Sequence, residues 1–394
     1  MNNIVRRDTE IFIADIDIRT SLSALALESS VQTSFIKIVR CIVYSINYSI
    51  GLYTIDEEQK SQYSRRVRAN QIRYIFSSME NFHFLVFLGL MGFTLSQSLN
   101  GQPDVNTIFI RYYGNYSNSD INIQDTDTLM NYFKLSGCFV LYIHGYSESV
   151  NSESVNTIAA AYLNYTNTTL FAVDYSKFVQ GDYLSALSAV DIVAGALAST
   201  INKLYNAGVD QLKCMHIVGH SLGGQVSGRT AERLRFLPNR ITGLDPAGPL
   251  YFSNYLNASM AQFVDIIHTD AGAYGSIYDS GTVNFKPNFG HRVQPGCPLL
   301  VLPLSQGDYC SHHRSWRFWA ETLKNETGFL AVKCNSDIDF ILGLCDNKDI
   351  VPMGPATPRN TTGVYYLHTN ANSPFAKGIE GINGTGLAEN RASL

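Results

Sequence analysis

A serine between two glycines, in Gly219-His220-Ser221-Leu222-Gly223, is the residue of this sequence best placed for covalent chemistry. It follows the apolar stretch 213–219, which predicts a buried strand, and precedes a stretch typical of a helix. A sharp strand-to-helix turn lifts a serine oxygen above the sheet, and glycines are needed beside it because a Cβ would collide with neighbouring backbone. Glycine-rich packing turns produce the same pattern, so the motif alone leaves both interpretations open.

A serine hydroxyl becomes a nucleophile only when a base removes its proton and an acid orients that base. The chain order expected for this turn is serine, acid, histidine. Asp245, before Pro246 at the end of the predicted strand 240–248, is the candidate acid, with a plain Asp-Pro turn as the alternative and Asp265 and Asp270 as rivals. The histidines that follow it are His268, His291, His312, His313 and His368. The chemistry of the sequence alone does not show whether His312 or its neighbour His313 is the base.

An acyl-transfer site also needs two backbone N–H donors for the developing oxyanion. The residue after the nucleophile, Leu222, supplies one. The loop after an early strand supplies the other, and in His144-Gly145-Tyr146 that donor is the Tyr146 amide. The alternative for this loop is an ordinary turn at a strand end.

Short apolar strands alternate with helical stretches from about residue 105 onward. The predicted strands are 138–146, 170–175, 213–219 and 240–248, with helical stretches between and after them. This alternation predicts a mostly parallel central sheet flanked by helices, with working residues at the carboxyl ends of the strands. We expect a single α/β domain over residues 105–394.

The apolar run Phe82–Leu95 has the length of a signal-peptide core rather than of a membrane span. We therefore interpret 79–98 as a secretory signal peptide and 1–78 as an upstream extension of uncertain reality. The alternative is a signal anchor held in the cytosol by Arg65, Arg66, Arg68 and Arg73.

The cysteines and sequons favour the secretory pathway. Of the 7 cysteines, all but Cys41 follow the run. Glycosylation sequons after it begin at Asn115, Asn164, Asn167, Asn257, Asn325, Asn360 and Asn383. The net charge of -4, without basic runs interleaved with aromatics, argues against a nucleic-acid partner.

Several motifs in order resemble the pancreatic-lipase family of secreted lipases and phospholipases A1, especially its insect branch. They are IHGY, GHSLGGQVSG, ITGLDPAGP, FVDIIHTDAG, QPGC, CSHHRSW and YYLHTNANSPFAKG, between about 105 and 378. The resemblance implies the α/β-hydrolase fold, no cofactor, and a triad of Ser221, Asp245 and His312. It selects His312 because the family's C-x-H-x-R-S pattern begins at Cys310.

The resemblance further implies disulfides Cys297–Cys310 and Cys334–Cys345, the first of which closes a lid at 298–309. Cys138 and Cys214 either pair, as both begin neighbouring strands, or stay as free thiols. The lid at 298–309 is short, as in the phospholipase A1 members. Its apolar residues are Leu299, Leu300, Val301, Leu302 and Leu304. Contact with lipid is one interpretation of that composition, and inward packing of the side chains is the other.

Two departures from the family's pattern change what we expect. Too few residues follow His312 for the C-terminal β-sandwich domain, so no colipase-type partner is expected. The segment 250–262 has no carboxylate of the kind that calcium binds, so no metal is expected.

The sequence therefore predicts a secreted carboxylic ester hydrolase that cleaves acyl esters of glycerolipids at a membrane or lipid-droplet interface, either phospholipase A1-like or a neutral lipase. The alternatives are a catalytically weak lipid-binding or yolk-storage relative and a membrane-tethered lipase.

Overall fold

The computed structural model describes residues 103–114, 116–251 and 255–383, which belong to the second of two compact units, Phe76–Leu394. The extension 1–78, the segment 79–98 and Cys41 lie outside the described residues. The predictions made for them, and the expected lack of a C-terminal β-sandwich, therefore stay predictions.

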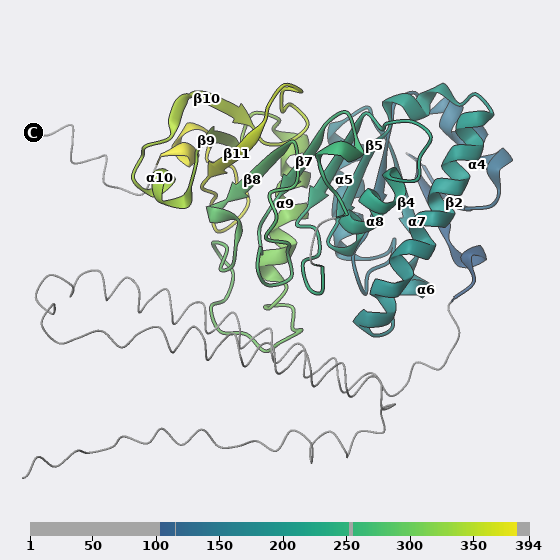
Figure 1. Cartoon of the computed structure of the whole chain (residues 1–394), viewed down its shortest axis with the longest axis horizontal. Coiled ribbons are helices and arrows are strands. Elements are labelled where there is room, and N and C mark those ends of the chain that lie inside the picture. The colour runs from purple at the N-terminus through teal and green to yellow at the C-terminus, as the bar shows by residue number, and fades with distance from the viewer. Residues whose placement is uncertain (1–102, 115, 252–254, 384–394) are drawn as a thin grey trace, which may run out of the picture. The chain divides into compact units, whose positions relative to one another are not determined.

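One sheet runs through the described residues (Figure 1). Its strands are β1 Phe109–Tyr113, β2 Asn118–Asn122, β3 Phe139–Ile143, β4 Thr169–Asp174, β5 His216–His220, β6 Arg240–Leu244, β7 Val264–Ile267, β8 Val283–Pro287, β9 Leu330–Lys333, β10 Asp346–Pro352 and β11 Gly363–Leu367. The order is β10-β9-β11-β8-β7-β6-β5-β3-β4-β1-β2. Pairing is parallel from β11 to β4 and antiparallel at both edges.

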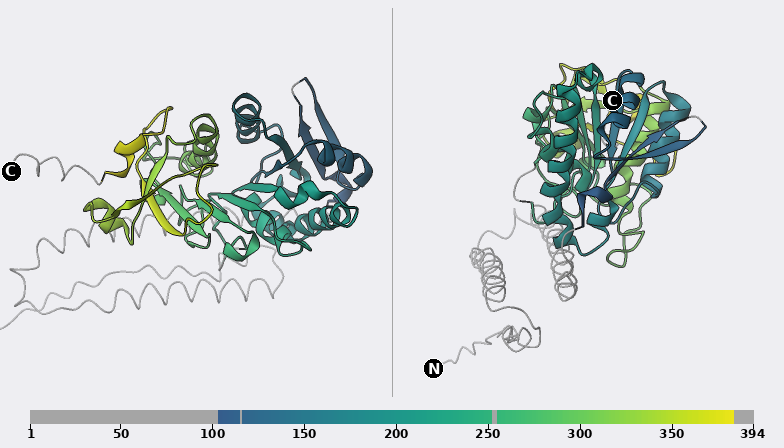
Figure 2. Two further views of the ribbon diagram at one scale, coloured as in Figure 1. Left: turned by 90° about the horizontal axis from the view of Figure 1, so that it is seen from above. Right: turned by 90° about the vertical axis from the view of Figure 1, so that its right-hand side faces the viewer.

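Helices cover both faces of the sheet (Figure 2). They are α4 Thr126–Leu135, α5 Glu153–Tyr165, α6 Ser176–Val179, α7 Tyr183–Asn206, α8 Leu222–Ala231, α9 Cys310–Lys324 and α10 Asp337–Ile341. Side chains alternate between faces along a strand. Accordingly, Leu141 and Ile143 of β3 join the core under α4, α7 and α8, while Val140 and Tyr142 join the core under α5 and α9.

This layered, mostly parallel architecture is the α/β-hydrolase fold, as predicted. The four predicted strands correspond to β3, β4, β5 and β6. The helix after the serine is shorter than its apolar pattern indicated and ends at Ala231. Beyond it, Leu234 and Phe236 pack against the core from irregular backbone, which preserves the apolar pattern without a helix.

Among the described residues, α7 is the one helix long and apolar enough to cross a membrane. Half of its most apolar window is buried inside the protein. It packs against α8 and contributes Val193, Leu197 and Ile201 to the core. Its hydropathy is therefore explained by core packing.

Three disulfides join the cysteines of the described region. They are Cys138–Cys214, Cys297–Cys310 and Cys334–Cys345. The first disulfide excludes the alternative of two free thiols. The two cysteines meet because Cys138 precedes β3 and Cys214 precedes β5, and these strands are neighbours in the sheet.

Candidate active site

Ser221 occupies a sharp turn between β5 and α8. Its backbone has φ 53° and ψ −122°, a strained conformation for a residue with a side chain. The flanking glycines are required by space. A Cβ on Gly219 would lie 2.4 Å from the Gly223 carbonyl oxygen, and one on Gly223 would lie 2.1 Å from the Ile143 carbonyl oxygen. The turn is thus the strand-to-helix turn that the motif predicted, not a loose packing loop.

Asp245 and His312 form the closest acid–base contact of the site. The Asp245 Oδ2 atom lies 2.5 Å from His312 Nδ1. The other carboxylate oxygen accepts the backbone N–H groups of Thr269 at 2.8 Å and Asp270 at 3.1 Å. Asp245 directly follows β6, and His312 is in the first turn of α9. These contacts hold the carboxylate in one orientation, which in turn fixes the imidazole plane.

Burial shifts the pKa of both groups. It lowers the pKa of His312 to about 3 and raises the pKa of Asp245 to about 6, against the backbone N–H donors that favour its anion. Both values lie below 7. Near neutral pH the carboxylate is therefore charged and the imidazole neutral, so Nδ1 donates to Asp245 and Nε2 is left to accept a proton.

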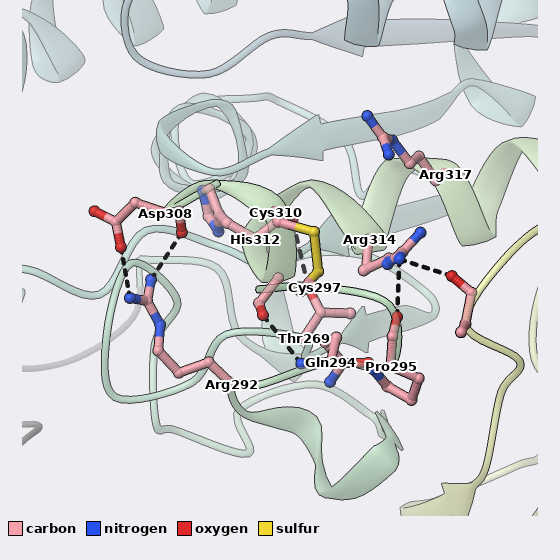
Figure 3. Close-up of a disulfide and its surroundings, with 12 residues drawn as sticks. Thr269, Arg292, Gln294, Pro295, Cys297, Asp308, Cys310, His312, Arg314 and Arg317 are labelled. Atoms are coloured by element: carbon pink, nitrogen blue, oxygen red, sulfur yellow. Dashed lines mark hydrogen bonds and ion pairs between the residues drawn. A yellow bond between two sulfur atoms is a disulfide. The ribbon is translucent and has the colours of Figure 1, made fainter. Parts of the chain in front are cut away.

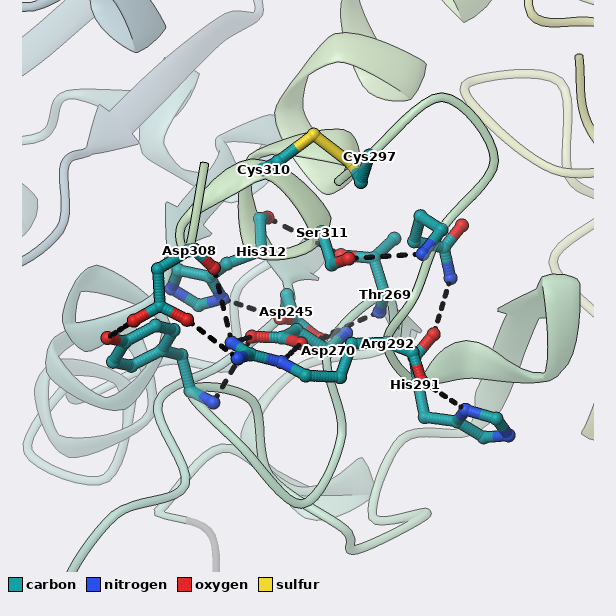
Figure 4. A network of polar contacts seen from close by, with 12 residues as sticks. Asp245, Thr269, Asp270, His291, Arg292, Cys297, Asp308, Cys310, Ser311 and His312 are labelled. Atoms are coloured by element: carbon teal, nitrogen blue, oxygen red, sulfur yellow. Dashed lines mark hydrogen bonds and ion pairs between the residues drawn. A yellow bond between two sulfur atoms is a disulfide. The ribbon is translucent and has the colours of Figure 1, made fainter. Parts of the chain in front are cut away.

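The two rival aspartates have other partners. Asp265 is buried in β7 and forms a bidentate ion pair with Arg240 at 2.8 and 2.7 Å. Asp270 forms a bidentate ion pair with Arg292 at 2.6 and 2.7 Å (Figure 4). Asp265 belongs to the core, whereas Asp270 contacts Asp245 through its backbone and supports it.

The five candidate histidines also differ in their contacts. His268 is buried against Asn284, His291 is exposed, and His368 packs on Phe340. His313 stacks on Tyr309 at 5.6 Å and lines the same cavity as His312. Of these described histidines, His312 is the one that contacts Asp245.

The loop that carries the second expected oxyanion donor passes directly against the serine. A Cβ on Gly145 would lie 3.0 Å from the Ser221 Cβ. Tyr146 is held by its hydroxyl, which donates to the Gly181 carbonyl at 2.7 Å. Leu222 is the first residue of α8, where backbone N–H groups have no partner within the helix. The two predicted donors therefore belong to adjoining segments beside Ser221.

A cavity of about 390 Å³ opens over these residues. Ser221 and His312 line it together with Tyr146, Tyr183, Tyr274, Leu304, Tyr309 and Trp316, among others. Its lining is mixed, because these aromatic and aliphatic side chains stand beside serine, glutamate and histidine side chains that include Glu148 and His220. Such a cavity offers both an apolar surface and polar groups to a ligand.

The segment 298–309 forms one border of this cavity and is closed by the Cys297–Cys310 disulfide (Figure 3). Four of its apolar side chains, Leu299, Leu300, Leu302 and Leu304, are 46–83% exposed, and Val301 is half-buried. Inward packing, the alternative for this loop, is therefore not what the structure has. A cluster of exposed leucines on a protein surface indicates a binding role.

An ion-pair network fastens the end of this segment. Arg292 reaches Asp308 at 2.8 Å as well as Asp270. Asp308 also accepts the Leu304 backbone N–H at 2.8 Å and the Tyr274 hydroxyl at 2.6 Å. The sequence did not single out Arg292 or Asp308. An arginine near the end of a cysteine-closed loop is too common a pattern to indicate such a role.

Asp245, Asp270 and His312 place one ligand atom each within 4.8 Å of one another, close enough to bind a metal ion. The carboxylate oxygens already have other partners. Asp270 is paired with Arg292, and Asp245 accepts two backbone N–H groups and faces His312. The donor set fits an acid–base pair with a supporting ion pair better than a metal centre.

Comparison with known proteins identifies the family of this chain. The model of the lipase family matches residues 93–375. Pancreatic lipase-related protein 3 of Homo sapiens is 33% identical over 228 residues, which cover 50% of this chain and 48% of that protein. Lipase member H-A of Xenopus laevis is 32% identical, with 59% and 52% covered, and pancreatic triacylglycerol lipase of Sus scrofa is 28% identical, with 70% and 68% covered.

The chain spans about half the length of the first curated relatives that it matches. A solved esterase of Pyrococcus furiosus is 16% identical in a match that covers 36% of this chain and 64% of the esterase, with a TM-score of 0.29. The family match extends over most of the chain and includes every residue of the site described above. The chain therefore belongs to the lipase family, as its resemblance to pancreatic lipases predicted.

Proposed function

We propose that this protein is a secreted serine hydrolase that cleaves acyl esters of glycerolipids with Ser221, Asp245 and His312. The observation that carries the proposal is the 2.5 Å contact between Asp245 and His312, where His312 and a strained serine line the same cavity. His312 takes the Ser221 proton as the hydroxyl attacks the acyl carbonyl, and then gives it to the leaving alcohol. Water releases the fatty acid in a second step.

The oxyanion of the tetrahedral intermediate is bound by the backbone N–H groups of Tyr146 and Leu222. Both donors come from backbone beside the nucleophile, and donors already in place need little reorganisation when the charge develops. The mechanism draws on no cofactor or metal.

We infer a preference for phospholipids, with release of the sn-1 acyl chain, from the short segment 298–309. A short lid leaves room beside the cavity for a polar head group, and its exposed leucines suit contact with a lipid surface. Hydrolysis of neutral glycerides is the second candidate.

Fatty-acid release from phosphatidylcholine vesicles and from triacylglycerol emulsions tests the proposal. Ser221→Ala should abolish both activities, whereas Ser188→Ala, on the outer part of α7, should leave them unchanged. Turnover that survives in Ser221→Ala would refute the mechanism. A pure, folded protein without any turnover would favour the lipid-binding alternative, and activity on triacylglycerol alone would refute the phospholipid preference.

Secretion is supported by the three disulfides and by the exposed sequon asparagines Asn164, Asn167, Asn325 and Asn360. N-terminal sequencing of the protein from the medium of expressing cells tests it. A start near residue 99 supports cleavage of the predicted signal peptide, and an intact residue 1 would refute it.

A further inference from the structure

Glu148 is a carboxylate inside the active-site cavity for which the reaction proposed above has no role. Its side chain is 14% exposed, and it lines the cavity three residues after Gly145. It is neither the nucleophile, the base nor the acid, and it does not supply an oxyanion N–H. A charged side chain beside a site where negative charge develops needs a reason to be there.

The Glu148 carboxylate binds both segments that carry the oxyanion donors. Its Oε2 atom accepts the Gly145 backbone N–H at 2.5 Å, one residue before the Tyr146 donor. The same oxygen lies 3.1 Å from Nδ1 of His220, the residue before Ser221. One oxygen atom therefore joins the loop after β3 to the turn after β5.

The remaining contacts fix the carboxylate itself. Its Oε1 atom accepts the Ser154 hydroxyl from α5 at 2.6 Å. His220, on the far side, packs its ring on His312 with centroids 4.9 Å apart. Burial raises the pKa of Glu148, but His220, His144 and the Ser154 hydroxyl together outweigh burial and hold this pKa below its ordinary value. Glu148 is thus an anion that accepts from every neighbour it touches.

We infer that Glu148 is a positioning residue that sets the distance and orientation between the Tyr146 and Leu222 donors by bridging Gly145 and His220. The inference rests on the proposed hydrolase function and assigns a residue that the triad does not include. Geometry carries the effect rather than charge, because the bridging oxygen needs only to accept two hydrogen bonds. A misplacement of about 1 Å in such a constellation costs on the order of 10²-fold in rate.

The variants Glu148→Ala and Glu148→Gln separate positioning from charge. Alanine removes the bridge, whereas glutamine keeps an oxygen that accepts from Gly145 and His220 and places its amide beside the Ser154 hydroxyl. On p-nitrophenyl butyrate, a soluble ester that needs no lipid surface, Glu148→Ala should lower kcat by about 10²-fold with KM within about threefold. Glu148→Gln should recover kcat to within about tenfold of the wild type.

Glu321 provides the matched control. It accepts three hydrogen bonds as well, from the Ser373 hydroxyl and the backbone N–H groups of Phe375 and Ala376, but it does not line the cavity. Glu321→Ala should lower the melting temperature and leave kcat unchanged. The rate at which a fluorophosphonate modifies Ser221 should fall with kcat in Glu148→Ala, because the phosphonate also develops an oxyanion.

Each outcome bears on the inference. A Glu148→Ala protein with wild-type kcat and a lowered melting temperature would overturn it and leave a structural role. A raised KM with unchanged kcat would overturn it in favour of substrate binding, and a glutamine variant as slow as the alanine variant would overturn the geometric account. An inactive wild type that fluorophosphonate does not modify would overturn the proposed function itself.

Discussion

Replacing Asp245 by asparagine tests the acid–base pair with a change of almost no volume. In the native site Oδ1 accepts the Thr269 and Asp270 backbone N–H groups, and Oδ2 faces His312 Nδ1 at 2.5 Å. An asparagine must keep its oxygen on the two backbone donors, so its NH₂ group faces His312. Nδ1 then has to accept, and the ring proton moves to Nε2, where it points at the serine.

We therefore expect Asp245→Asn to impair His312 as a base and to leave the fold intact. His312 in the wrong tautomer cannot take the serine proton, and the imidazolium that forms in the transition state loses its counter-charge. Together these effects lower kcat by about 10⁴-fold, or about 5.4 kcal/mol at 1.36 kcal/mol per decade. The carboxylate is fully buried, so water cannot substitute for it.

Initial rates on p-nitrophenyl butyrate measure this loss, with circular dichroism to check the fold. Asp279→Asn is the control, because Asp279 is partly exposed and pairs with Lys286 outside the cavity. A kcat reduced by less than tenfold in Asp245→Asn would refute the reasoning, since Asp270 or another group would then have to orient the base.

Three further outcomes are expected. Because burial lowers the pKa of His312, the base stays neutral as pH falls through 6.5. In a pH profile of kcat/KM, activity should therefore decline only below pH 6.5, and an acid limb centred at 6.5 or above would contradict this. Arg240→Met leaves the buried Asp265 carboxylate with the Thr242 hydroxyl but without its counter-charge, and should lower the free energy of unfolding in urea by about 3–5 kcal/mol with kcat unchanged. A loss below about 1 kcal/mol would show that the ion pair is dispensable. Leu300→Ser with Leu302→Ser should reduce hydrolysis of phosphatidylcholine vesicles by about tenfold or more and leave p-nitrophenyl butyrate unaffected, and equal losses on both substrates would indicate damage to the cavity instead.

The parts of the site that the sequence predicted are those with strict local requirements. A residue between Gly219 and Gly223 can be recognised because backbone carbonyls leave no room for a Cβ at either glycine. Asp245 could be proposed because parallel strands deliver their carboxyl ends to one edge of the sheet. The antiparallel edges at β1, β2, β9 and β10 were not predicted individually, because their strands are only partly buried and lack a sharp apolar pattern.

Other residues could not be predicted because their role depends on contacts across the fold. The choice between His312 and His313 needed the family pattern, since neighbouring residues on a helix differ only in the direction they face. Glu148 and Arg292 act by joining segments that are distant in sequence, and nothing in their own surroundings marks them. The residues proposed to perform chemistry were therefore more visible in this sequence than those proposed to hold them in place.

That difference has a physical basis in how the two kinds of residue are constrained. Ser221 occupies a turn in which neighbouring backbone carbonyls leave no room for a Cβ at Gly219 or Gly223, so the turn fixes the residue types at both positions. The role of Glu148 requires only an oxygen atom within hydrogen-bond distance of Gly145 and His220. Several types of side chain, at more than one position in the sequence, could satisfy this condition. If the glutamine variant of Glu148 is active and the asparagine variant of Asp245 is not, the site contains one carboxylate required for its shape and one required for its charge.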